Sequence, residues 1–233
     1  MEVLRLEDEL PQLLEMIEIE YWPMVTSKRW EGDLDIAFVE GSVSTPREIK
    51  EIKKIRSRAS SLVAFGECAL TGCIPSIRSF MTQRDAEEEV YEHPDWIESI
   101  KPNGISEYVR VDVSLPGCPP HRNTILEVIK AAALRRRPHL RHHSVCIECK
   151  LRDNSCLLTG EKRPCMGPVT HAGCGAICPS LNRECEGCYG PMDAANPSSH
   201  SQILAEIGLS WDDVKRKFRK YAGATAEYRR ETE

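Results

Sequence analysis

The sequence lacks the features of an exported or membrane-spanning protein. Its opening residues, MEVLRLEDELPQLLEM, show none of the basic region, apolar core and small-residue cleavage site that make up a secretory signal. No run of about eighteen apolar residues occurs, which is the length that a helix needs to cross a bilayer. We therefore expect a cytoplasmic protein without a membrane span, in which cysteine thiols stay reduced.

The chain also lacks an excess of basic side chains. Its 31 lysine and arginine residues are balanced by 36 aspartate and glutamate residues, which gives a formal net charge of -5. This balance provides no general attraction to nucleic acid or to an anionic membrane, and we expect neither as a partner. Acids, bases and nucleophiles form no convincing constellation in the sequence, so we expect no catalytic residue on this chain.

Cysteine, in contrast, is abundant. The 233 residues include 11 cysteines, and eight of them fall between Cys146 and Cys188. In a reducing compartment, such dense spacing favours metal binding over disulfide bonds.

The first part of the chain has the pattern of a parallel α/β domain. LDIAFVEG (34–41) and SLVAFG (61–66) are short apolar runs typical of buried strands. Between them, a Ser-Thr-Pro sequence opens a charged helix over 47–59. Strand, helix and strand with short connections indicate a βαβ unit, whose functional sites lie at the carboxyl ends of its strands. Glu40 and Cys68 both fall at such ends.

Further elements of this domain follow from local patterns. Leucines at helical spacing predict an amphipathic helix over 2–19, and an alternating pattern predicts a strand over 108–118 that ends at Cys118. RNTILEVIKAAALRRR predicts a helix over 122–137. Residues 81–106 are polar, and we expect them to form an irregular excursion.

The second half of the chain has a different character. From about 139 to 192 apolar periodicity disappears, and this glycine-, proline- and cysteine-rich stretch needs something besides hydrophobic burial to hold it together. The tail over 200–223 predicts one or two helices. We therefore expect an α/β domain over 1–138, a cysteine-rich domain over 139–192 and a helical tail over 193–233.

The eight clustered cysteines form two quartets. The first quartet is Cys146, Cys149, Cys156 and Cys165, and the second quartet is Cys174, Cys178, Cys185 and Cys188. Each quartet supplies four thiolates, which are the ligands that iron–sulfur clusters require. Four thiolates also satisfy a structural zinc ion, but zinc modules typically pair two CxxC knuckles per ion, whereas each quartet has one. The spacing favours iron–sulfur clusters and leaves zinc as the alternative.

Several blocks, in the correct order, resemble one known family. They are DIAFVEGSVST, VAFGECALTGCIP, LPGCPP and CLLTGEKRPCMGPVTHAGCGAICPSLNRECEGCYGP. Over about residues 1–192 the chain resembles the small, electron-transferring subunit of [NiFe] hydrogenases, in particular the cytoplasmic class that includes the delta subunit of sulfhydrogenases and NADP-linked hydrogenases.

This resemblance implies a fold and a function. The fold is a flavodoxin-like parallel-sheet domain followed by an irregular iron–sulfur cluster-binding domain. The function is electron transfer within an oxidoreductase that acts on hydrogen. The catalytic Ni-Fe site is expected on a separate large subunit, and an iron–sulfur or flavin partner such as a diaphorase would exchange electrons at the other end.

The resemblance also assigns cluster ligands. The first quartet corresponds to a distal [4Fe-4S] cluster and the second quartet to a medial one, in which Cys178 replaces the proline that accompanies a three-iron cluster in many relatives. Cys68 and Cys118 correspond to two of the four ligands of a third, proximal [4Fe-4S] cluster. The other two ligands, in a CxGC turn, would precede Met1.

Two explanations fit the incomplete proximal set. We expect that the reading frame starts late, at an internal methionine, because Cys68 and Cys118 are both retained and because a sheet without its first strand would expose an apolar edge. The alternative is a variant whose proximal cluster is altered or absent, and which serves a redox complex other than a hydrogenase.

The remaining candidates have weaker signals. We interpret Cys73 as a packed or partly exposed thiol rather than a ligand. His143 has the spacing of a histidine ligand found at the distal site of some relatives, but we favour ligation by cysteines alone. Glu40 either tunes the proximal cluster or contacts the large subunit, or it is an ordinary carboxylate at a helix entry. A basic cluster either docks an acidic partner or complements a helix end. It comprises Arg135, Arg136, Arg137 and Arg141.

Overall fold

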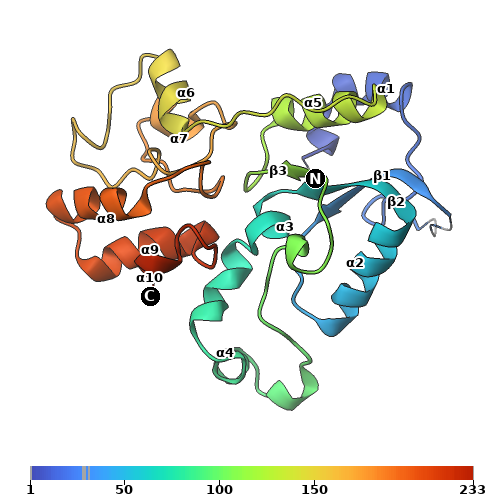
Figure 1. The fold of residues 1–233 in the computed structure, drawn as a ribbon, viewed down its shortest axis with the longest axis horizontal. Coiled ribbons are helices and arrows are strands. Elements are labelled where there is room, and N and C mark those ends of the chain that lie inside the picture. The colour runs from blue at the N-terminus through green and yellow to red at the C-terminus, as the bar shows by residue number, and fades with distance from the viewer. Residues whose placement is uncertain (1, 28–29, 31, 233) are drawn as a thin grey trace.

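A three-stranded sheet forms the centre of the α/β part of the molecule (Figure 1). The computed structural model describes residues 2–27, 30 and 32–232. The strands are β1 (Leu34–Glu40), β2 (Ala59–Phe65) and β3 (Val113–Leu115), which lie in that order with both pairs parallel. The prediction of an α/β fold with a parallel sheet is therefore confirmed.

The crossover between β1 and β2 is the helix α2 (Pro46–Arg58). It begins with a capping box, because the backbone N–H of Glu48 donates to Thr45 Oγ1 at 3.2 Å and the N–H of Thr45 donates to Glu48 Oε2 at 2.9 Å. Pro46 occupies the first helical position, where its missing N–H costs no hydrogen bond. The Ser-Thr-Pro sequence thus starts the helix where it was predicted.

Helices cover both faces of the sheet (Figure 1). The helices α1 (Glu9–Leu14) and α5 (Arg122–Ala133) lie over one face, and α2 and α3 (Glu67–Thr71) lie over the other. Alternation along β2 produces this division, since successive side chains of a strand point to opposite faces. Val63 packs beneath α1 and α5, whereas Leu62 and Ala64 pack beneath α2 and α3.

Three predicted elements are shorter in the structure. The amphipathic segment contains a 3-10 helix (Leu4–Leu6) and α1 instead of one helix, because Glu7 has a φ of 41° and interrupts helical geometry. The strand expected over 108–118 pairs only within β3. The helix expected to reach residue 137 ends at Ala133, because Arg135 adopts a φ of 51°.

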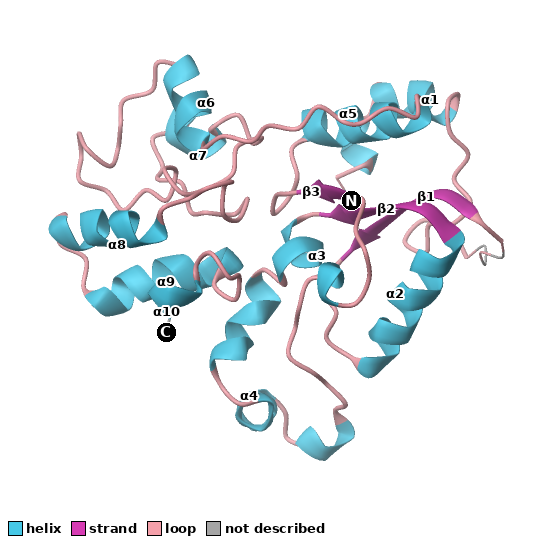
Figure 2. Cartoon of the chain, in the orientation of Figure 1, coloured by secondary structure: helices cyan, strands magenta, loops and turns pink. Residues whose placement is uncertain are grey.

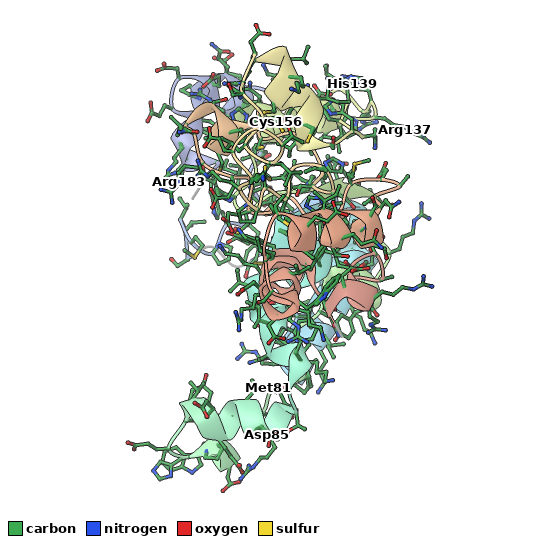
Figure 3. All side chains as sticks on the ribbon, turned by 90° about the vertical axis from the view of Figure 1, so that its left-hand side faces the viewer. Met81, Asp85, Arg137, His139, Cys156 and Arg183 are labelled. Atoms are coloured by element: carbon green, nitrogen blue, oxygen red, sulfur yellow. The ribbon has the colours of Figure 1, made fainter. Side chains whose placement is uncertain are left out.

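The excursion over 81–106 contains a helix that we did not predict. Thr82 caps α4 (Gln83–Val90) through a 3.1 Å hydrogen bond from the N–H of Asp85. Two short 3-10 helices follow, Pro94–Trp96 and Ile105–Glu107. Figure 3 shows the segment with Met81 and Asp85 standing away from the rest of the chain. The helix escaped prediction because few of its side chains face a core, so it lacks apolar periodicity.

The cysteine-rich stretch is mostly loop, as Figure 2 shows. Its short helices are α6 (Val145–Leu151) and α7 (Ile177–Ser180). The tail forms α8 (Pro197–Glu206), α9 (Trp211–Ala222) and α10 (Arg229–Thr232), which confirms that it is helical, and a 3-10 helix over Ile74–Phe80 lies against α9. None of the helices within the described residues is both long and apolar enough to cross a membrane.

The tail packs on the cysteine-rich stretch and shares its core. Val145, Met166 and Val169 pack together with Leu204 and Phe218 of the tail. The division into three domains stays a prediction, but these contacts show that apolar burial in the cysteine-rich stretch depends on the tail helices.

Leu62 provides a test of this architecture. It is fully buried on β2 and packs with Ile52 and Ala69. We expect Leu62→Ala to lower the free energy of unfolding by about 2–5 kcal/mol, because the cavity forms between the sheet and two helices. Chemical denaturation followed by circular dichroism would measure the loss. Ser60→Ala, on the same strand but exposed, is the matched control and should change stability by less than about 0.5 kcal/mol.

Candidate functional site

Cys68 and Cys118 lie at the carboxyl-terminal edge of the sheet. Cys68 is on α3, directly after β2, and Cys118 is in the loop after β3, the hydrogen-bonded neighbour of β2. A backbone hydrogen bond joins the two loops, because the N–H of Glu67 donates to the carbonyl of Gly117 at 2.9 Å. We call Cys68 and Cys118 the sheet-edge pair.

A third thiol joins the sheet-edge pair. The side chain of Cys73 is fully buried and forms hydrogen bonds with both Cys68 and Cys118. Its hydrogen bond lowers the pKa of the Cys68 thiol to about 7 and raises the pKa of Cys73 itself. Sequence reasoning separated Cys73 from the other two cysteines, whereas the structure gathers three thiols at the sheet edge.

The first quartet converges at one place in the cysteine-rich stretch. Cys146 and Cys149 are on α6, and Cys156 and Cys165 come from the loop that follows. Burial raises the pKa of the Cys146 thiol to about 11, and charge repulsion from the other three thiols adds to the shift. The Sγ atoms of Cys146 and Cys165 both border Gly167, where a Cβ would lie 3.4 and 3.5 Å from them.

The second quartet converges next to the first. Burial raises the pKa of Cys188 to about 12, with added repulsion from Cys174 and Cys178. Backbone N–H groups donate to the sulfurs, for example Gly187 to Cys185, and this favours the thiolate form.

Backbone contacts place the three groups of thiols in a row. The N–H of Cys118 donates to the sulfur of Cys188, which links the sheet-edge pair to the second quartet. The N–H of Cys185 donates to Cys165 Sγ at 3.3 Å, which links the second quartet to the first. The thiols therefore run from the edge of the sheet through the second quartet to the first.

Such a grouping favours bound cations. Burial and mutual repulsion hold the thiols of Cys146, Cys165, Cys174 and Cys188 in their protonated form when no metal is present. A metal centre displaces these protons and neutralises the thiolates, so its binding stabilises the loops that carry them. The donor set therefore fits thiolate-bound metal.

Comparison with known proteins identifies the family. Residues 1–132 match the family described as NADH ubiquinone oxidoreductase, 20 Kd subunit. The chain belongs to this family. The sulfhydrogenase 2 subunit delta of Pyrococcus furiosus is 35% identical to this member of the 20 kDa subunit family, over 94% of this chain and 92% of that protein.

Two further comparisons extend the likeness. The vhu-type iron–sulfur chain of the F420-non-reducing hydrogenase of Methanocaldococcus jannaschii is 30% identical over 88% of this chain and 83% of that protein. A solved structure of an NAD+-reducing [NiFe]-hydrogenase in the H2-reduced state contains a chain with 27% identity and a TM-score of 0.56, covering 60% of this chain and 86% of that one.

These relatives confirm the predicted resemblance to the electron-transfer subunits of hydrogenases. This member of the 20 kDa subunit family is therefore an oxidoreductase subunit of the hydrogenase type, with the expected α/β fold and a cysteine-rich region after it. The ligand assignments for the individual cysteines stay predictions.

Sequence reasoning missed a buried carboxylate between the quartets. Glu148 lies on α6, and its Oε2 accepts hydrogen bonds from the N–H groups of Gly173 (3.2 Å) and Gly175 (2.9 Å), on either side of Cys174. Its Oε1 lies 3.3 Å from Arg141 Nε. Glu148 therefore fastens the helix of the first quartet to a loop of the second. Its position in the sequence CIEC, between two candidate ligands, was the available signal.

A second missed carboxylate lies between the sheet edge and the second quartet. Glu67 is buried, and burial raises its pKa to about 7. Its Oε1 accepts a hydrogen bond from Thr71 Oγ1 at 2.9 Å. Gly190 packs so closely that a Cβ there would lie 2.3 Å from Glu67 Oε1, and its φ of 66° also favours glycine. The carboxyl group therefore fixes the approach of the two cysteine-bearing regions.

The remaining predicted residues occupy varied positions. Glu40 is exposed at the end of β1, and its charge acts to raise the pKa of Cys68, so it does lie beside the sheet-edge pair. His143 Nδ1 is 3.0 Å from the carbonyl oxygen of Ser144. In the basic cluster, two arginines already have acidic partners within this chain. Arg136 pairs with Glu127 at 2.7 Å and Arg141 pairs with Glu148.

The role of Glu148 can be tested by Glu148→Gln. The substitution keeps the shape but leaves one oxygen for two backbone donors and an arginine, and hydrogen bonds to a charged group are worth about 1.5–3 kcal/mol. We expect the amides of Gly173 and Gly175 to exchange hydrogen at least about tenfold faster, as measured by mass spectrometry or NMR. Glu206→Gln, on an exposed part of α8, should leave their exchange unchanged.

Proposed function

We propose that this chain is the iron–sulfur electron-transfer subunit of a cytoplasmic [NiFe] hydrogenase. The observation that carries the proposal is the row of thiols that runs from the sheet-edge pair through the second quartet to the first. Electrons would pass along this row between a large subunit that holds the Ni-Fe site and an iron–sulfur or flavin partner such as a diaphorase. The hydrogenase relatives support the same assignment.

The proposed cofactors are two [4Fe-4S] clusters, held by the two quartets, and a third at the sheet edge once its remaining ligands are supplied. Zinc bound by four thiolates would hold their sulfurs about 3.8 Å apart, because the Zn–S bond is about 2.3 Å long. Among the described residues, one group of histidine, cysteine or acidic ligand atoms lies within 4.8 Å of one another, and it contains no cysteine. The wider spacing of the thiols supports iron–sulfur clusters over zinc.

The protein's own contribution is to hold and tune these centres. Cys165 and Cys185 are buried, which limits water at the contact between the quartets. Backbone N–H groups of Gly167 and Gly187 donate to their sulfurs, and such hydrogen bonds raise the reduction potential of a cluster. The residues therefore position the centres in sequence and adjust their relative potentials.

The excursion around α4 supports a partner protein. Val90 and Trp96 expose 70% and 79% of their surface, which is unusual for large apolar side chains on a segment that stands away from the body (Figure 3). We propose that a hydrogenase subunit covers this surface in the assembled enzyme.

Co-expression with the [NiFe] large subunit tests the function. We expect the two chains to purify together and to reduce a viologen dye with hydrogen. Cys188→Ser should lower this dye reduction at least about tenfold, because it interrupts the row of thiols, while hydrogen–deuterium exchange by the large subunit persists. Ser180→Ala, which changes a side chain outside the quartets, is the control. Purification without a large subunit would favour a different redox complex.

The fourth ligand of the second quartet gives a separate prediction. Wild-type protein with two filled quartets should contain about eight irons. Cys178→Pro should lower this number by about one and produce the electron paramagnetic resonance signal of a three-iron cluster in oxidised protein. Cys178 lies in the first turn of α7, where proline is tolerated.

Ile177→Ala, at the neighbouring exposed position, should retain all the iron and the wild-type spectrum. An unchanged spectrum in Cys178→Pro would contradict the assignment of Cys178 as a ligand. Zinc in place of iron in the wild-type protein would favour a structural subunit.

A further inference from the structure

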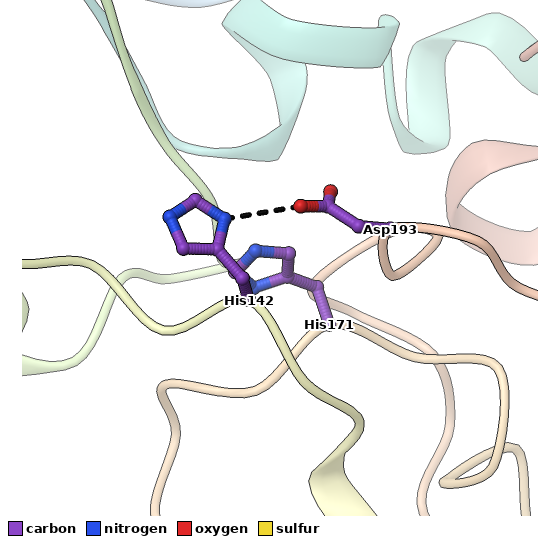
Figure 4. Close-up of side chains that lie close together, drawn as sticks. All are labelled: His142, His171 and Asp193. Atoms are coloured by element: carbon purple, nitrogen blue, oxygen red, sulfur yellow. Dashed lines mark hydrogen bonds and ion pairs between the residues drawn. The ribbon is translucent and has the colours of Figure 1, made fainter.

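Two histidines and an aspartate meet on the surface of the cysteine-rich stretch, outside both quartets. The ligand atoms of His142, His171 and Asp193 all lie within 4.8 Å of one another. His142 Nδ1 is 3.0 Å from Asp193 Oδ2, and Figure 4 shows the ring of His171 beside them. The three residues come from segments that are far apart in the sequence, so local sequence does not account for their meeting.

Backbone hydrogen bonds hold the three segments in register. The N–H of Ala172 donates to the carbonyl of His143 at 2.8 Å, which fixes the segment of His171 beside that of His142. The N–H of His171 donates to the carbonyl of Gly190 at 3.0 Å, and the N–H of Met192 donates to the carbonyl of Val169 at 2.9 Å. Isolated antiparallel bridges at Ser144–His171 and Thr170–Pro191 belong to the same ladder. The arrangement is therefore built by the backbone and not only by side-chain rotamers.

The histidine in the middle of the ladder is oriented for coordination. His171 Nδ1 lies 2.7 Å from the carbonyl oxygen of Ala172. A carbonyl only accepts hydrogen bonds, so Nδ1 carries the proton and Nε2 keeps a free lone pair. Donation of the second ring N–H to a carbonyl is the usual way in which proteins orient metal-binding histidines.

The site is open on one side. All three residues line a cleft of about 700 Å³, which is also lined by the acidic residues Glu67 and Glu227. His142 and Asp193 expose 71% and 66% of their side chains. Three protein ligands at the wall of an accessible cleft leave coordination positions for water or another small ligand.

We propose that His142, His171 and Asp193 bind one divalent transition-metal ion of the zinc type. Two imidazole nitrogens and one carboxylate oxygen match the ligand preference of such ions, whereas calcium and magnesium prefer oxygen ligands alone. The ion replaces the direct contact between His142 and Asp193 with bonds to a shared centre. It also cross-links three segments of the domain that carries the quartets, at a place that the quartets do not occupy.

Zinc binding to the purified protein, with its iron content measured in the same sample, tests the proposal. We expect about one zinc per chain after dialysis, with nitrogen and oxygen and no sulfur in the X-ray absorption spectrum at the zinc edge. His142→Ala and Asp193→Asn should each weaken zinc binding at least about tenfold without loss of iron, because both side chains are exposed. His139→Ala removes an exposed histidine from the same segment, lies outside the group and should bind zinc as the wild type does.

Three results would overturn the proposal. They are failure of the wild type to retain zinc, sulfur ligands in its zinc spectrum, and zinc affinity in both site variants equal to that of the wild type. The readout follows zinc and not electron transfer, so it is independent of the proposed function.

Discussion

The contact between the two cysteine quartets is the constraint on which the rest of the structure depends. The N–H of Cys185 donates to Cys165 Sγ at 3.3 Å, and in return the N–H of Met166 donates to the carbonyl of Cys185 at 2.9 Å. These reciprocal bonds set two buried cysteines of different quartets side by side. Because electron transfer between centres requires short separation, the arrangement of every other thiol is meaningful only if this contact holds.

Little apolar surface is available to maintain that contact. The loops that carry the quartets contribute Met166 and Val169 to a core that is completed by the tail. The hydroxyl of Tyr228, the residue just before α10, donates to the carbonyl of Val169 at 2.9 Å, so even the end of the tail reaches back to the loops. The tail is thus part of the cysteine-rich unit in physical terms. Glu148 adds a polar fastening between α6 and the loop around Cys174.

The parts of the molecule that could be predicted from sequence are those with a local physical cause. The capping box at Thr45 and the apolar runs of β1 and β2 specify a βαβ unit without any long-range information. The metal-type spacing of the quartets was equally legible. In contrast, α4 was missed because a helix that faces solvent on most sides has no apolar stripe.

Long-range contacts account for what sequence could not give. Cys73 looked separate from Cys68 and Cys118 because its relation to them depends on where the turn after α3 places a buried side chain. Likewise, His142, His171 and Asp193 become a site only through a ladder between three distant segments. No spacing rule links residues separated by such distances in the chain.

The same reasoning explains why Gly190 and Glu67 occur where the two halves of the molecule meet. A buried carboxyl group costs free energy unless it finds partners, and Glu67 has Thr71 and the close backbone of Gly190 rather than a basic side chain. Burial accordingly raises its pKa to about 7. A larger residue than glycine would push the loop of Cys188 away from the sheet edge, where the N–H of Cys118 meets the Cys188 sulfur. The closeness of the sheet-edge pair to the second quartet is therefore set by a glycine and a carboxyl group, neither of which is a candidate ligand.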